Sequence, residues 1–197
     1  MSLILQQLKC SACGAPLKSK ERDRMLVCGH CGTLSLFAEG KMNAVGFSIA
    51  KPNTEGKDPV VYIPFWLVEA EVKVLHEKIS GGGISRMVTG KKQMRGKQTF
   101  YICAADAIPE EFSRVWNMEL TLNPPEFSTI PEFKNGEKIV MTMEKETAES
   151  NAEFIFLRYE TEIPGTLQEL DYDFDVSATK VLYLPAFKKS SGYQLGV

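Results

Sequence analysis

Four cysteines near the start of the chain constrain its fold more than any other feature of the sequence. Cys10 and Cys13 form one Cys-x-x-Cys pair, Cys28 and Cys31 form a second, and fourteen residues separate the two pairs. Each pair supplies two neighbouring thiolates, so two pairs at this distance can surround one tetrahedral metal ion. The spacing therefore predicts a four-cysteine metal site within the first 32 residues of the chain.

A glycine, Gly14 or Gly32, directly follows each cysteine pair. Glycine suits the tight loop of a metal knuckle, where the backbone turns back so that its N–H groups face the sulfurs. We predict that the ion is zinc in a structural role, because protein fills all four positions and leaves none for water or substrate. Two alternatives stay open: iron in a rubredoxin-like site uses the same four thiolates, and two disulfides would form in an oxidising compartment.

Residues 8–36 resemble a zinc ribbon, a module found in transcription factors, polymerase subunits and many uncharacterised microbial proteins. The resemblance covers about a sixth of the chain and implies a fold of two knuckles and a short sheet. It implies no single function, because ribbons bind DNA, RNA or protein, or brace a neighbouring domain. The whole chain is also similar to uncharacterised prokaryotic proteins in which a ribbon precedes a β-rich domain with strands like the Tyr-Ile-Pro-Phe-Trp of Tyr62–Trp66.

The length of 197 residues suits one ordinary domain plus a small module. We expect a ribbon at residues 1–38, a linker or edge strand at 39–58, and a β-rich domain at 59–197. The formal net charge is −2, which counts against a protein that grips nucleic acid along its length. Because a ribbon has no core of its own, we expect Cys10→Ser to unfold the ribbon and leave the β-rich domain mostly intact.

The sequence predicts a cytoplasmic protein without a membrane-spanning segment. The longest apolar run, Val60–Val68, contains a proline and is far shorter than the ~20 residues that a helical span needs. The first residues lack the basic region and the cleavage site of a signal peptide. The fifth cysteine, Cys103, lies in an apolar stretch and is expected to be a buried thiol in a reducing compartment.

The main body is expected to be α+β, with a β-rich, mainly antiparallel sheet and few short helices. Val60–Leu75 alternates between apolar and charged residues over its second half, as a strand with one buried face does. Within it, Pro64 is expected to mark an edge, a bulge or a break, because proline cannot donate to the ladder. The aromatic residues expected to be buried are Tyr62, Phe65 and Trp66.

Other segments have weaker patterns. Further strands are expected at residues 25–27, 45–49 (as an edge strand), 84–88, 99–105, 154–159, 171–176 and 181–187. A helix is expected at Lys145–Ala152, and one helical turn within Ile108–Trp116. Three segments that begin with Tyr62, Tyr101 and Tyr183 look alike, which indicates either a repeated strand type or chance.

A basic segment at residues 81–97 contains no acidic residue. Its cations are Arg86, Lys91, Lys92, Arg95 and Lys97. It lacks the first glycine of a phosphate-binding loop, so we expect an exposed and mobile basic hairpin. Such a hairpin is either a solvated turn or a contact for an acidic partner or a nucleic-acid backbone.

No catalytic device emerges from the remaining polar residues. His30 lies in the second knuckle, where four cysteines already fill the site, and His76 has no nucleophile placed beside it. An acidic run resembles the start of a calcium loop but has Val176 where that loop needs glycine. The carboxylates of this run are Asp171, Asp173 and Asp175.

The sequence therefore favours a zinc-binding, non-enzymatic adaptor that acts through a protein partner. The alternative is a nucleic-acid-binding or transcription-associated zinc-ribbon protein, in which the ribbon and the basic segment form one basic surface.

Overall fold

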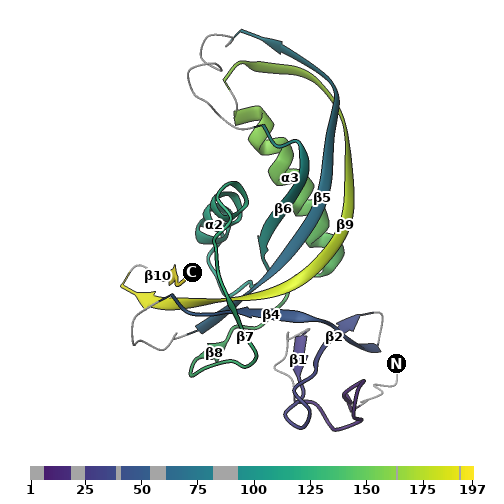
Figure 1. The fold of residues 1–197 in the computed structure, drawn as a ribbon, viewed down its shortest axis with the longest axis vertical. Coiled ribbons are helices and arrows are strands. Elements are labelled where there is room, and N and C mark those ends of the chain that lie inside the picture. Colours follow the sequence, from purple (N-terminus) through teal and green to yellow (C-terminus); the bar gives the residue numbers. More distant parts are fainter. Residues whose placement is uncertain are drawn as a thin grey trace, which may run out of the picture.

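Two sheets and two helices make up the part of the chain that the computed structural model describes, residues 7–18, 25–38, 41–53, 61–81, 93–162, 164–190 and 192–197 (Figure 1). A small antiparallel sheet consists of β1 (Met25–Val27), β2 (Leu34–Ala38) and β3 (Lys41–Ala44). The strands of a larger, seven-stranded sheet are β4 (Phe47–Ala50), β5 (Val61–Ser80), β6 (Gly96–Cys103), β7 (Thr129–Ile130), β8 (Glu137–Lys138), β9 (Thr166–Lys189) and β10 (Gly192–Leu195). The helices are α2 (Glu110–Leu122) and α3 (Lys145–Glu162). The chain is thus α+β and β-rich, as predicted.

Strands β5 and β9 form the centre of the large sheet, whose order is β6-β5-β9-β4-β7. They pair antiparallel along almost their whole length, from Val61 opposite Ala186 to Ser80 opposite Thr166. Strand β5 confirms the strand predicted at 60–75 and extends beyond it. Strand β9 joins the two strands predicted at 171–176 and 181–187 into one.

The outer ends of β5 and β9 leave the sheet as a two-stranded arm, residues 73–80 and 166–173. Strand β6 pairs with β5 only as far as Val72, opposite Gly96. The β5–β9 register shifts after Glu69, Val74 and Lys78, and bulges of this kind bend strands. Figure 1 shows the two strands curving together as an arc beyond the rest of the sheet.

The inner halves of β5 and β9 are buried on both faces, because a helix packs on each side. On one face, Tyr62 and Trp66 pack in the same cluster as Phe156 of α3. On the other face, Phe65 packs with Trp116 of α2. The predicted burial of all three aromatic residues of β5 is confirmed.

Pro64 lies inside a central strand, opposite Tyr183 of β9, without a break in the strand. Its carbonyl accepts a hydrogen bond from Ala104 N, at 2.9 Å, just past the end of β6. The N–H and C=O of one strand residue point to the same side of the strand. An N–H at position 64 would therefore point toward Ala104 and away from β9, so proline removes no hydrogen bond of the β5–β9 ladder. The prediction of an edge, bulge or break is wrong here, and the ladder with β9 is unaffected.

Both helices are longer than the sequence predicted. The strand predicted at 154–159 is wrong, because α3 continues to Glu162 and buries Ala148, Ala152, Ile155 and Tyr159 along one face. This spacing of four, three and four residues is helical and outweighs the β-forming composition of the segment. Helix α2 likewise extends the single turn predicted within Ile108–Trp116 to thirteen residues.

The small sheet includes β3, which lies within residues 39–58, the segment expected to be a linker or edge strand. Strand β4 follows and is not at an edge, because it runs parallel to β9 on one side and pairs with the short β7 on the other. The strand predicted at 84–88 lies outside the described residues. No helix that the structure describes is long and apolar enough to cross a membrane.

Candidate metal centre

Each cysteine pair lies in a tight turn built in the same way. The N–H of Gly14 donates to the Cys10 carbonyl, and the N–H of Gly32 donates to the Cys28 carbonyl, both at 2.9 Å. Both glycines have positive φ angles, +71° and +73°, which a side chain would disfavour. The N–H of Ala12 lies 3.4 Å from the Cys10 sulfur and donates to it. These are the knuckles that the sequence predicted.

The two turns bring the four sulfur atoms into one cluster. The Sγ atoms of Cys10 and Cys31 are 3.6 Å apart, as are those of Cys13 and Cys28, and all four lie within 4.8 Å of one another. A tetrahedral ion with Zn–S bonds of about 2.3 Å places its sulfurs about 3.8 Å apart. The sulfurs are too far apart for disulfide bonds, and all four cysteines are free. The group can hold one metal ion, and the same four thiolates suit zinc or iron.

Within the cluster, the pKa values of Cys31 and Cys13 shift in opposite directions. Hydrogen bonds with Thr33, first that of its hydroxyl and second that of its backbone, are the main cause that lowers the pKa of Cys31 to about 6. A backbone hydrogen bond at Ala15 lowers the pKa of Cys13, but the neighbouring thiols and desolvation raise it to about 12. Without a cation, thiolates in one cluster oppose further ionisation. A bound dication removes this opposition and favours the fully deprotonated set.

The small sheet packs against the main body. Met25 of β1 and Leu34 of β2 are fully buried and belong to the same cluster as Trp66 of β5. Phe47 of β4, the strand that follows the small sheet, packs against this cluster. The small sheet next to the cysteine cluster therefore packs its apolar side chains into the core of the large sheet. The small sheet and the large sheet share one hydrophobic core.

The basic segment differs from its prediction at Arg95. Arg95 Nη1 lies 2.6 Å from Glu160 Oε1 of α3, and its Nη2 lies 3.2 Å from Glu77 Oε2 of β5. The guanidinium is thus paired with two carboxylates from distant parts of the sequence, and the prediction that Arg95 is fully exposed is wrong. Lys97 is exposed, as predicted. Arg86, Lys91 and Lys92 lie outside the described residues.

The other candidate residues stay apart from the cysteine cluster. His30 is exposed in the second knuckle, and His76 lies 3.7 Å from Glu169 on the arm. Burial raises the pKa of the Cys103 thiol to about 11, which is typical of an inert buried cysteine. The run of carboxylates on β9 is solvent-exposed. These residues are Asp171, Asp173 and Asp175.

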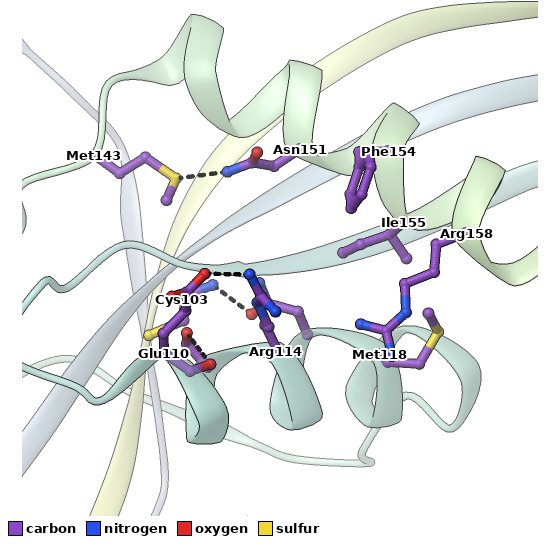
Figure 2. Close-up of a pocket in the computed structure, with 11 residues that line it drawn as sticks. Cys103, Glu110, Arg114, Met118, Met143, Asn151, Phe154, Ile155 and Arg158 are labelled. Atoms are coloured by element: carbon purple, nitrogen blue, oxygen red, sulfur yellow. Dashed lines mark hydrogen bonds and ion pairs between the residues drawn. The ribbon is translucent and has the colours of Figure 1, made fainter.

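Sequence reasoning missed a cavity of about 490 Å³ between α2 and α3 (Figure 2). Arg114 and Met118 of α2 line it from one side, and Phe154 and Arg158 of α3 line it from the other. Because the sequence predicted a strand at 154–159, this prediction placed no helix opposite α2 and therefore no cavity here. The four-residue spacing of each pair is the signal that would have placed each pair on one helical face.

Comparisons of the chain with protein-family models, with curated proteins and with solved structures find no match. What the cysteine cluster can do is therefore decided by its own geometry and chemistry.

Proposed function

We propose that this chain is a zinc-binding protein whose metal is structural and whose activity is to bind a protein partner. The observation that carries the metal assignment is the convergence of four cysteine sulfurs within 4.8 Å of one another. Protein ligands fill a tetrahedral shell here, and a closed shell leaves no position for a substrate or a nucleophilic water. Zinc is favoured over iron as the usual ion of paired Cys-x-x-Cys knuckles.

Packing supports a structural role for the ion. The ribbon has little apolar interior of its own, and Met25 and Leu34 complete the core of the large sheet. An ion that fixes both knuckles also holds β1 and β2 against that core. Metal binding then contributes to the stability of the whole protein rather than to that of a detached module. This replaces the expectation that Cys10→Ser would leave the larger domain mostly intact.

The test of the metal is elemental analysis of reduced, purified protein. We expect about one zinc per chain, lost in Cys10→Ser and in Cys28→Ser. Cys103→Ser is the matched control, because it removes a buried thiol outside the cluster and should keep the full zinc content. Iron in place of zinc, or metal-free wild-type protein that is fully folded, would overturn the assignment.

A protein partner is favoured over nucleic acid by charge. Arg95, one of the five cations of the basic segment, is neutralised by two carboxylates. The chain as a whole is acidic, whereas nucleic-acid binding draws its affinity from cations that replace counterions on phosphates. The test is a titration of wild type and of Lys91→Glu/Lys92→Glu with mixed DNA and RNA at two salt concentrations. Tight wild-type binding that falls steeply with salt and is lost in the variant would refute the protein-partner proposal.

A further inference from the structure

The cavity between α2 and α3 lies beside the edge strand of the large sheet. Figure 2 shows α2 on one side of the cavity and α3 on the other, with Cys103 of β6 beside Glu110 of α2. Its volume of about 490 Å³ is within the usual range for small-molecule pockets, roughly 300–1,000 Å³. None of the four cysteines of the candidate metal centre lines it.

The edge of β6 in this region is closed to an added strand. Its N–H groups at Tyr101 and Cys103 already donate to Thr121 Oγ1 and Asn117 Oδ1 of α2, at 3.0 and 2.8 Å. A peptide that bound by extending the sheet would need these donors. The cavity therefore suits a ligand that contacts side chains.

One part of the cavity wall is apolar. Met118 of α2, Met143 before α3, and Phe154 and Ile155 of α3 line it. The Phe154 side chain is notable because 64% of its surface is exposed, although an aromatic ring gains much from burial. Figure 2 shows this ring at the cavity, on the side of α3 that faces α2. A ligand with an apolar body would cover it.

Another part of the wall is cationic. Arg114 extends from α2 and Arg158 extends from α3, so the two guanidinium groups line the cavity from opposite helices (Figure 2). Glu110 is the one carboxylate in the lining, which leaves an excess of positive charge in a chain whose net charge is −2. Charge complementarity therefore favours an anionic group.

Existing ion pairs leave these arginines able to bind an anion. Arg114 pairs with Glu110 and Arg158 pairs with Glu162, both at helical i, i+4 spacing on exposed surface. Such pairs contribute only about 0.3–0.5 kcal/mol each. Each guanidinium carries five N–H donors, and one hydrogen bond to its carboxylate partner occupies one of them.

We propose that the α2–α3 cavity binds a small amphipathic anion, an apolar chain or ring with a carboxylate at one end. The carboxylate lies between Arg114 and Arg158, and the apolar body covers Phe154 and the two methionines. This site is independent of the metal centre and of the protein partner proposed above.

The test is calorimetric titration of the zinc-loaded, full-length protein with decanoate below its micelle concentration. Decanoate should bind with one site per chain, while acetate, which lacks the apolar chain, and decanol, which lacks the charge, should bind at least about tenfold more weakly. Arg158→Gln and Phe154→Ala should each weaken decanoate binding about five- to tenfold. Both side chains are exposed, so these variants should fold. Lys188→Gln, on an exposed lysine of β9 outside the cavity, is the matched control and should bind like wild type.

Methionine methyl NMR locates the ligand within the same protein. The signals of Met118 and Met143 should shift during the titration, whereas that of Met25, buried beside the ribbon, should not. The proposal is overturned by equal affinity for decanol and decanoate, by equal binding in Lys188→Gln and the two cavity variants, or by shifts that bypass both cavity methionines. Absence of any decanoate binding by the wild type also overturns it.

Discussion

Arg95 offers a sharp test of how the large domain is held together. Its guanidinium contacts both carboxylate oxygens of Glu160, at 2.6 and 3.3 Å, and one oxygen of Glu77, at 3.2 Å. The Glu160 side chain is only 1% exposed, whereas that of Arg95 is 25% exposed. One cation therefore connects the start of β6, the last turns of α3 and the β5 strand of the arm.

Replacing Arg95 with methionine should cost about 3 kcal/mol of unfolding free energy. The change leaves Glu160 buried without its cation, and breaking a buried pair in this way costs about 3–5 kcal/mol. The lower end applies because the arginine is partly exposed, so water can reach the site that it vacates. The loss of Glu77 as a partner adds little, because that contact is more exposed.

Urea unfolding at neutral pH, followed by tryptophan fluorescence, measures the effect. With a slope of about 2 kcal/mol per molar urea, Arg95→Met should lower the midpoint by about 1.5 M. The double variant Arg95→Met/Glu160→Leu should lie within about 1 kcal/mol of wild type, since it removes both charges together. Glu77→Gln should cost about 0.5 kcal/mol and serves as the control. The reasoning is refuted if Arg95→Met costs no more than Glu77→Gln, or if the double variant is no more stable than Arg95→Met.

Three further outcomes are expected. Trp66→Ala should lower the free energy of unfolding in urea by about 3–5 kcal/mol, because the ring is buried and its Nε1 donates to a backbone carbonyl. A loss under about 1 kcal/mol would contradict the place of Trp66 in the core. Chelation of the metal should lower the thermal unfolding midpoint of the whole chain, because Leu34 of the small sheet lies in the core that both sheets share. A main calorimetric transition that stays unchanged after chelation would contradict this coupling. Desolvation and a hydrogen bond to Glu153 raise the pKa of Tyr172 to about 12 from 10.0. The stability that this residue contributes is therefore present below pH 10 and lost as the pH rises toward 12. Tyr172→Phe should lose less stability than wild type over that interval, and identical alkaline unfolding curves would count against the shift.

The sequence predicts well those features that depend on neighbouring residues. The four cysteines that cluster in space belong to two local motifs, and the glycine after each pair has the positive φ angle that its turn requires. The central strand was recognisable because Val68, Val72 and their neighbours alternate with charged residues. The aromatic residues at Tyr62–Trp66 are buried because two helices cover both faces of that strand.

Features that depend on distant partners were not predictable in this way. Arg95 looked unpaired because no acid is near it in the sequence, and its main partner is 65 residues away. Helix α3 looked like a strand near Phe154 because aromatic and β-branched residues favour strands, but the sheet face it covers selects the helical spacing. The cavity needed both helices to be placed correctly, so it could not be found once either was misassigned.

The pairing of β5 with β9 has a consequence for how the chain acquires its structure. Between these two strands lie β6, both helices and two short strands, so the central ladder closes a very long loop. Contacts of such large sequence separation form slowly and late. During synthesis, the aromatic part of β5 emerges long before β9 is available to cover one of its edges. Until then the edge of β5 that β9 will cover is unpaired, and an exposed apolar strand edge of this kind favours aggregation.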